Sequence, residues 1–245
     1  MNAVVLLSGG MDSTTALAQA VVDGAVNIVA VSFQYGSRHQ LQELASAERV
    51  VKYYNRFGFC IERVVVIIPH HIFVGSGSSL IGESDIPDEE YHDPEKETPS
   101  STVVPFRNAN MISIATTVAE SRGYDKVYVG VHATDAQGFA YPDCTPEFMG
   151  AMSAAIYVGT HHKVRLVTPF QWMDKSDIVT LAAKLLAPLH LTWSCYRGGE
   201  KQCGHCPTCR ERLHAFSEAG FIDPVAYEHG EHQMIMMLKP WPTGD

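Results

Sequence analysis

Short runs rich in valine and isoleucine alternate along this chain with longer segments whose apolar residues recur every three or four positions. The first pattern is typical of buried parallel strands and the second of amphipathic helices. The expected strands are 4–7, 28–33, 63–68, 126–131 and 164–168, and the expected helices are 40–57, 108–122, 146–158 and 175–186. Gly24, Gly58 and Gly123 stand where helices would end. The alternation predicts an α/β fold with a doubly wound parallel sheet.

Length and composition fit one large α/β domain with a small appendage. The chain has 245 residues, of which 46% are hydrophobic and 18% are charged, as in ordinary globular proteins. We see no apolar stretch long enough to cross a bilayer and no basic leader before the first expected strand. We therefore expect a cytoplasmic protein that does not bind membranes.

The net charge of −9 comes mostly from one segment. Residues 75–101 hold eight acidic side chains against Lys96 alone, which leaves the rest of the chain nearly neutral. A nearly neutral body offers no broad basic face, so binding of a whole tRNA is not expected. The segment breaks the strand–helix alternation, and two interpretations stay open: a mobile lid or disordered insert, or a solvated acidic loop without function.

Residues 8–13 read Ser-Gly-Gly-Met-Asp-Ser and lie between the first expected strand and a helical segment. A tight turn that opens a helix aims several backbone N–H groups at one anion. Gly9 and Gly10 let the backbone approach a phosphate, and Asp12 can hold a magnesium ion beside it. Further hydroxyl donors come from Ser8, Ser13 and Thr14.

An ordinary glycine turn would also contain two glycines, but the flanking strand, the aspartate and the hydroxyls favour a nucleotide site. No Gly-Lys-Ser/Thr follows the glycines, so the loop is not a Walker A motif. It resembles the SGGxDS loop of the ATP pyrophosphatases, which hold the pyrophosphate of ATP while a substrate oxygen is adenylated. That resemblance implies an adenine nucleotide alpha hydrolase-like fold.

Four of the six cysteines lie within fifteen residues: Cys195, Cys203, Cys206 and Cys209. The two-residue gaps form a tight knuckle, and four thiolates complete a closed tetrahedral set, as in structural zinc sites. An iron–sulfur cluster and redox-active thiols are the alternatives, and His205 is expected to be a bystander. We expect a small zinc-binding helical region at 191–245, after an α/β domain at 1–190. The other two cysteines, Cys60 and Cys144, are expected in the core, with a substrate contact or a role as a transient nucleophile as the alternatives for Cys144.

Together these motifs resemble the 7-cyano-7-deazaguanine synthases (the QueC family) of the queuosine and archaeosine precursor pathway. The resemblance runs in the family's order from residue 4 to about residue 213 and includes the cysteine cluster. The matching motifs are Ser8–Ser13, Phe33-Gln-Tyr35-Gly-Ser-Arg38-His39, Val104-Pro105-Phe-Arg107-Asn108, Gly130-Val131-His132-Ala-Thr-Asp135, Tyr141-Pro142-Asp143-Cys144 and Asp174-Lys175.

The resemblance implies a carbon–nitrogen ligase that converts 7-carboxy-7-deazaguanine and ammonia to 7-cyano-7-deazaguanine. ATP would adenylate the carboxylate, ammonia would displace AMP to give an amide, and a second activation would permit dehydration to the nitrile. The cofactors implied are ATP, Mg²⁺ and Zn²⁺, and the family is expected to be a homodimer.

Site residues follow from the matched motifs. The implied nucleotide-binding residues are Leu7, Ser8, Gly9, Gly10, Met11, Asp12, Ser13, Thr14, Thr15, Ala16 and Leu17, with Ser32 and Phe33 beside the adenine. The implied catalytic residues are Lys175, Arg38, Asp12 and Arg107. The implied substrate-binding residues are Phe106, Arg107, Asn108, His132, Asp135, Tyr141 and Asp143. Duller interpretations remain for some: a helix-capping pair at 107–108, a plain turn at 141–143 and a surface lysine at 175.

Three other functions compete with this assignment. A tRNA thiolation or lysidine enzyme would carry a tRNA-binding domain or a basic surface, and this chain shows neither. A related enzyme of a defence or modification system would join a deazaguanine to a protein or to DNA. A zinc-knuckle interaction module would not need the intact 8–13 loop.

Overall fold

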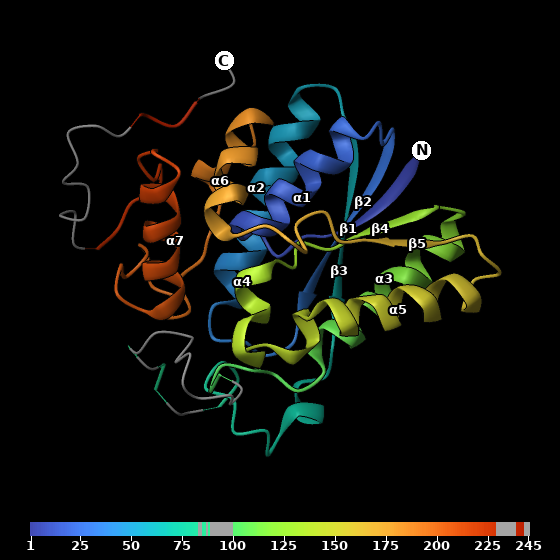
Figure 1. The fold of residues 1–245 in the computed structure, drawn as a ribbon, viewed down its shortest axis with the longest axis horizontal. Helices are drawn as coiled ribbons and strands as arrows, with labels where there is room; N and C mark the ends of the chain where they lie inside the picture. The colour runs from blue at the N-terminus through green and yellow to red at the C-terminus, as the bar shows by residue number, and fades with distance from the viewer. Residues whose placement is uncertain (83–84, 87, 89–99, 229–238, 243–245) are drawn as a thin grey trace.

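A parallel five-stranded sheet forms the centre of the molecule in the computed structural model, which describes residues 1–82, 85, 86, 88, 100–228 and 239–242 (Figure 1). Its strands are β1 (Asn2–Leu6), β2 (Asn27–Gln34), β3 (Cys60–Ile67), β4 (Lys126–Tyr128) and β5 (Arg165–Val167). They lie in the order β3-β2-β1-β4-β5, and every pairing is parallel. The doubly wound sheet expected from the sequence is therefore confirmed.

Helices cover both faces of the sheet. The α-helices are α1 (Met11–Val22), α2 (Gln40–Arg56), α3 (Arg107–Arg122), α4 (Ala133–Ala136), α5 (Pro146–Gly159), α6 (Lys175–Lys184) and α7 (Pro207–Glu218). Short 3₁₀ turns lie at His70–Phe73, Gln137–Phe139, Pro142–Cys144 and Leu189–Leu191. The four helices expected from apolar spacing are confirmed, with ends that differ by one or two residues.

Alternate residues of the strands face two separate cores. Val4 packs with residues of α3 and α5, whereas its neighbours Ala3 and Val5 pack with residues of α1, α2 and α6. The strand order reverses between β1 and β4, because the chain crosses from β3 back over β1. In a sheet of this kind the crevice for a ligand lies at that reversal, outside the carboxyl ends of the strands.

Strand β3 differs from the expectation of a buried strand at 63–68. It lies at the edge of the sheet and pairs with β2 alone, so Val65 and Ile67 stay 42% and 71% exposed. Cys60, expected in the core, is exposed at the start of this strand. The valine-rich sequence predicted a strand correctly, but its burial depends on its place in the strand order, and an edge strand has only one neighbouring strand.

Helix α7 belongs to the region that follows the sheet and packs against α6 (Figure 1). Most of the acidic segment lies outside the described residues. Its described parts include Leu80 and Ile86, which are buried, and Asp88, whose carboxylate lies 2.6 Å from the guanidinium of Arg197.

Candidate functional site

A cavity of about 240 Å³ lies at the carboxyl ends of β1, β2 and β4, where the strand order reverses. It brings together twelve of the residues predicted from the sequence. These are Leu7, Ser8, Gly10, Met11, Asp12, Ser13, Ser32, Phe33, Arg107, Asn108, Asp135 and Lys175. Because they come from five separate motifs, their meeting in one cavity supports a single site rather than unrelated turns.

The 8–13 loop closes tightly between β1 and α1. Ser8 Oγ accepts from the Gly10 N–H at 3.2 Å and lies 3.1 Å from Ser13 Oγ, which in turn donates to the Gly10 carbonyl. Gly10 is the N-cap of α1 and makes no side-chain cap. The first N–H groups of the helix therefore point into the cavity without an intrahelical acceptor, which is the arrangement that binds phosphate.

Gly9 is required for a reason that the sequence did not indicate. Its φ of +86° is left-handed, and a Cβ there would lie 2.5 Å from Ala47 N and 2.6 Å from the Glu43 carbonyl oxygen. The residue thus permits close packing of the loop against α2, and Gly9 does not itself line the cavity. Gly130 likewise permits close packing against the start of α1, where a Cβ would meet the backbone of Asp12 at 2.9 Å.

A cluster of charged side chains lies beside the start of α1. Lys175, the first residue of α6, donates to Glu211 at 2.6 Å and lies 3.7 Å from the Asp12 carboxylate. Burial alone would lower the pKa of Lys175, but the carboxylates of Asp12 and Glu211 raise it above its usual value. A lysine that stays charged beside a phosphate-binding loop can neutralise a departing pyrophosphate.

The same cluster contains carboxylates that fit a magnesium ion. Asp12 Oδ1 is buried and has no hydrogen-bond partner among the described residues. The carboxylates of Asp12 and Asp135 both lie within 4 Å of His132 Nε2, at 3.8 and 3.3 Å. Two carboxylates near a phosphate site are the donors from which Mg²⁺ is usually held, together with substrate oxygens and water.

A polar network at the start of α3 explains two of the predicted residues. The Asn108 backbone N–H donates to Asp143 Oδ2 at 2.9 Å, so Asp143 satisfies an N-terminal donor of the helix. Arg107 projects into the cavity and donates to the Tyr35 hydroxyl at 3.2 Å. The Asn108 side-chain amide donates to the Asp143 carbonyl at 3.4 Å and to Cys144 Sγ at 3.2 Å. Burial raises the pKa of that thiol well above its usual value, so it is neutral.

Some predicted site residues lie outside the cavity lining. They are Gly9, Thr14, Thr15, Ala16, Leu17, Arg38, Phe106, His132, Tyr141 and Asp143. The Tyr141 hydroxyl is buried against Thr102 Oγ1 at 2.5 Å, and burial raises its pKa to about 12. Arg38 donates to the Gly82 carbonyl at 2.7 Å, and Phe106 is 64% exposed with a left-handed φ of 53°. His132 is fully buried, and its Nε2 lies 3.3 Å from the carboxylate of Asp135, which lines the cavity. His132 therefore positions Asp135 without lining the cavity itself.

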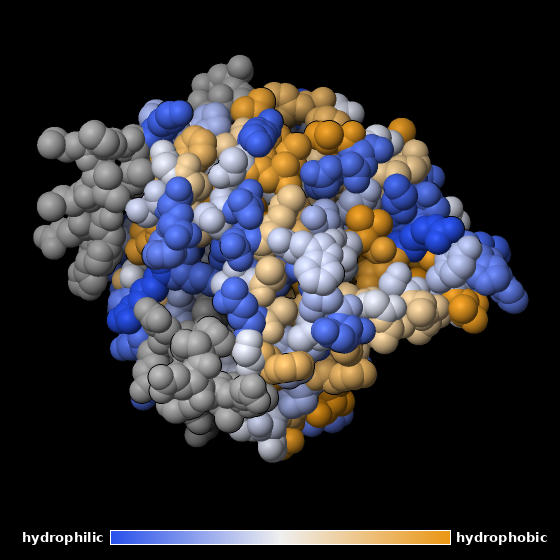
Figure 2. Space-filling model, viewed as in Figure 1, coloured by the Kyte–Doolittle hydropathy of each residue, from blue (hydrophilic) through white to orange (hydrophobic). Residues whose placement is uncertain are grey.

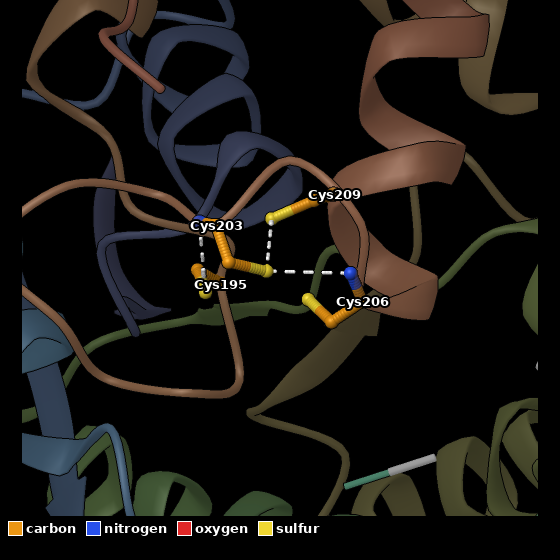
Figure 3. A group of neighbouring side chains, drawn as sticks. All are labelled: Cys195, Cys203, Cys206 and Cys209. Atoms are coloured by element: carbon orange, nitrogen blue, oxygen red, sulfur yellow. Dashed lines mark hydrogen bonds between the residues drawn. The ribbon is translucent and has the colours of Figure 1, made fainter. Parts of the chain in front are cut away.

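The four clustered cysteines form a compact sulfur site. Their sulfur atoms lie within 4.8 Å of one another, and all four residues are buried (Figure 3). Backbone N–H groups of Cys203 and Cys206 point at the sulfurs of Cys195 and Cys203. Hydrogen bonds from the neighbouring thiols lower the pKa of Cys206, which favours a thiolate there. His205 contacts the Cys203 carbonyl instead of the sulfur group. This donor set fits a closed four-coordinate metal ion.

Residues 189–196, which include Cys195, connect the sulfur site to the cavity. The Trp193 backbone N–H donates to the Gly9 carbonyl at 2.9 Å, and Trp193 and Ser194 both line the cavity. Buried Arg212, on α7, donates to Thr192 Oγ1 at 2.7 Å and to the Leu189 carbonyl at 3.3 Å. The sulfur site and α7 therefore position residues 189–196, which form part of the cavity wall and contact the 8–13 loop at Gly9.

Several residues of the site were not predicted from the sequence. Glu43, Trp193 and Tyr196 line the cavity, and Glu211 holds Lys175. Helical spacing could have found Glu43, which lies one turn after His39 in a predicted motif. Nothing local marks Glu211, since its partner is 36 positions away.

The fold and the loop define an α/β protein with a doubly wound parallel sheet and a PP-loop-type turn between β1 and α1. The family model described as "Queuosine biosynthesis protein QueC" matches residues 2–220, which is most of the chain. The chain belongs to this family, as the sequence motifs predicted.

Named relatives agree with the family assignment. A 7-cyano-7-deazaguanine synthase from Thermoplasma volcanium is 43% identical over 230 residues, which cover 92% of this chain and 90% of the relative. Another from Methanoculleus marisnigri is 44% identical, with 93% and 99% covered. One from the bacterium Oceanobacillus iheyensis is 40% identical, with 92% and 98% covered.

A solved structure of the U34-tRNA thiolase NcsA from Methanococcus maripaludis, with its [4Fe-4S] cluster, matches 77% of this chain and 58% of its own. Its TM-score is 0.46 and its sequence identity 16%, a level of similarity that does not bear on which metal the cysteines here hold. Among the described residues no helix has the length and apolar character needed to span a membrane.

Proposed function

We propose that this protein is an ATP-dependent carbon–nitrogen ligase that converts 7-carboxy-7-deazaguanine and ammonia to 7-cyano-7-deazaguanine. The observation that carries the proposal is the cavity itself, which joins the 8–13 loop to Lys175, Arg107 and Asp135 in a chain 40–44% identical to synthases of that name. These relatives are named for the nitrile, not for transfer of a deazaguanine to protein or DNA, so we do not propose that alternative.

The reaction needs two activations of one carbon atom. A carboxylate oxygen attacks the α-phosphorus of ATP and releases pyrophosphate, and ammonia then attacks the acyl carbon, so that AMP leaves and an amide forms. The amide oxygen attacks a second ATP in the same way. Departure of AMP with loss of the remaining N–H protons gives the nitrile.

The residues present suit these steps. The N–H groups at the start of α1 and the Ser8 and Ser13 hydroxyls would receive the departing pyrophosphate, and Lys175 would balance its growing charge. Arg107 presents a fork of donors that matches a substrate carboxylate. Asp12 and Asp135 would hold Mg²⁺, which supplies further charge neutralisation at the phosphates.

We also propose zinc in the four-cysteine site, a homodimer and a cytoplasmic location. A closed sulfur set supports structural zinc, and thiols kept reduced for metal fit the cytoplasm. An apolar strip of α5, which includes Ala151, Ala155 and Val158, is exposed and would suit a subunit contact (Figure 2). Light scattering on the purified protein tests the dimer.

Incubation with ATP, magnesium, ammonium and 7-carboxy-7-deazaguanine, followed by mass spectrometry, tests the proposed reaction. We expect the nitrile, with AMP and pyrophosphate formed twice per nitrile. Protein that carries its metal and yields neither amide nor nitrile would overturn the proposal.

A further inference from the structure

A second group of side chains lines the cavity, and the reaction described above gives most of them no role. It consists of Tyr35, His39, Glu43 and Tyr196, together with Arg107. The rings of His39 and Tyr196 lie 5.0 Å apart between centroids with a 34° tilt, and His39 Nε2 lies 3.5 Å from Glu43 Oε1. Aromatic faces beside a carboxylate make a surface suited to a flat heterocycle with N–H donors.

Three carboxylates line the cavity in the described part of the chain: Asp12, Glu43 and Asp135. Asp12 and Asp135 approach His132, and Asp12 also approaches Lys175, so both belong to the phosphate and magnesium cluster. Asp143, which the family resemblance implied as a substrate-binding residue, already accepts the N–H at the start of α3.

Glu43 is the carboxylate left for the base. Its side chain keeps 18% of its surface exposed, so it is reachable from the cavity although α2 holds it in place. Burial is the main cause that raises the pKa of the Tyr35 hydroxyl; Arg107 lowers it, and the charge of Glu43 raises it. The carboxylate of Glu43 and the guanidinium of Arg107 therefore both lie near Tyr35 in the cavity wall. This pair of opposite charges suits a ligand that has an anionic group at one end and N–H donors along another edge.

We propose that Glu43 determines specificity for the base, by accepting hydrogen bonds from its ring N–H and its 2-amino group. An ionised carboxylate is an acceptor at both oxygens, so it can take these two adjacent donors as a bidentate pair. Arg107 then faces the carboxylate to be adenylated. This inference rests on the proposed function, because it takes the deazaguanine carboxylate as the substrate.

Glu43→Gln is the sharpest variant, since glutamine keeps the size but turns one acceptor into a donor. Wild type should prefer 7-carboxy-7-deazaguanine over the analogue that lacks the 2-amino group by about 100-fold or more in kcat/KM, because an enzyme group left unpaired penalises the wrong substrate. In Glu43→Gln the preference should collapse to a few-fold while the KM for ATP stays within a few-fold.

Glu48→Gln, on the same helix, is the matched control, because its side chain is 49% exposed and pairs with Lys52 at the surface. It should keep the wild-type preference. Equilibrium binding of the two bases without ATP gives the same comparison for a variant that turns over slowly, and thermal denaturation shows that each variant is folded.

The outcomes separate the two proposals. If wild type makes the nitrile and Glu43→Gln retains the full preference for the 2-amino group in turnover and binding, the role of Glu43 is wrong and the proposed function stands. If wild type makes neither amide nor nitrile, the proposed function fails and the role of Glu43 fails with it. Collapse of the preference in Glu43→Gln alone supports the inference.

Discussion

Replacing Asp223 by asparagine removes the charge that neutralises a fully buried arginine. Arg212 Nε and Nη2 donate to the two Asp223 oxygens at 2.7 and 2.9 Å, and the Tyr227 hydroxyl donates to Oδ2 at 2.6 Å. The side chains of Arg212 and Asp223 are 0% and 1% exposed. Asparagine has nearly the same shape, but only one of its two terminal atoms is an acceptor. Its NH₂ group would therefore face an N–H or O–H donor where Asp223 has an acceptor oxygen.

The expected loss follows from the charge left behind. Arginine does not deprotonate in proteins, and the other acceptors of Arg212, such as Thr192 Oγ1 and the Leu189 carbonyl, are neutral. Removing one partner of a buried ion pair costs about 3–5 kcal/mol of unfolding free energy. For a chain of this size each kcal/mol corresponds to roughly 2–4 °C in Tm, so Asp223→Asn should lower Tm by roughly 6–20 °C.

Urea denaturation of Asp223→Asn and wild type measures the loss directly. Glu48→Gln is the control, because its partner Lys52 is 65% exposed and surface pairs contribute only about 0–1 kcal/mol. We also expect a higher KM for ATP in Asp223→Asn, since Arg212 holds the segment that contacts Gly9. An unfolding free energy within 1 kcal/mol of the Glu48→Gln control would refute the assignment of Arg212 as a buried charge that depends on Asp223.

Three further predictions concern the loop, the lysine and the metal. Lys175→Met should lower ATP–pyrophosphate exchange about 100-fold or more, because the pyrophosphate loses its cation; exchange at the wild-type rate would contradict this role. Gly9→Ala should cost about 2–4 kcal/mol in denaturation, since its Cβ would lie 2.5 Å from Ala47 N and its φ is left-handed; a neutral effect would show that α2 can move away. Cys206→Ser should lose the metal by elemental analysis and unfold at lower temperature, whereas wild type with no metal would rule out zinc.

Local pattern was enough to predict most of the fold and the four-cysteine sulfur site. Helix α2 and strand β2 begin and end within one residue of the sequence prediction, because their periodicity states which face is buried. The cysteines of the sulfur site are near neighbours in sequence, so their spacing alone brings three sulfurs together. Both inferences use only short-range geometry.

Roles that depend on distant contacts could not be predicted in the same way. The sequence places Asp143 in a motif, but only the packing of the 142–144 turn against α3 shows that its carboxylate bonds Asn108. Tyr141 was implied as a substrate-binding residue, yet its hydroxyl contacts Thr102, 39 positions away. Strand β3 could not be recognised as an edge because strand order does not follow from periodicity.

The strongest test of the link between metal and nucleotide combines two of the variants. Cys206→Ser and Asp223→Asn act on the 189–196 segment from different sides, through Cys195 and through the Arg212 contact to Thr192. If that segment holds the 8–13 loop as one unit, either change alone frees it, and the second change adds little to the KM for ATP. The double variant should therefore raise this KM by clearly less than the product of the two single effects, measured by pyrophosphate exchange at a temperature where all three proteins are folded. A full product would mean that the two supports act on the nucleotide site independently.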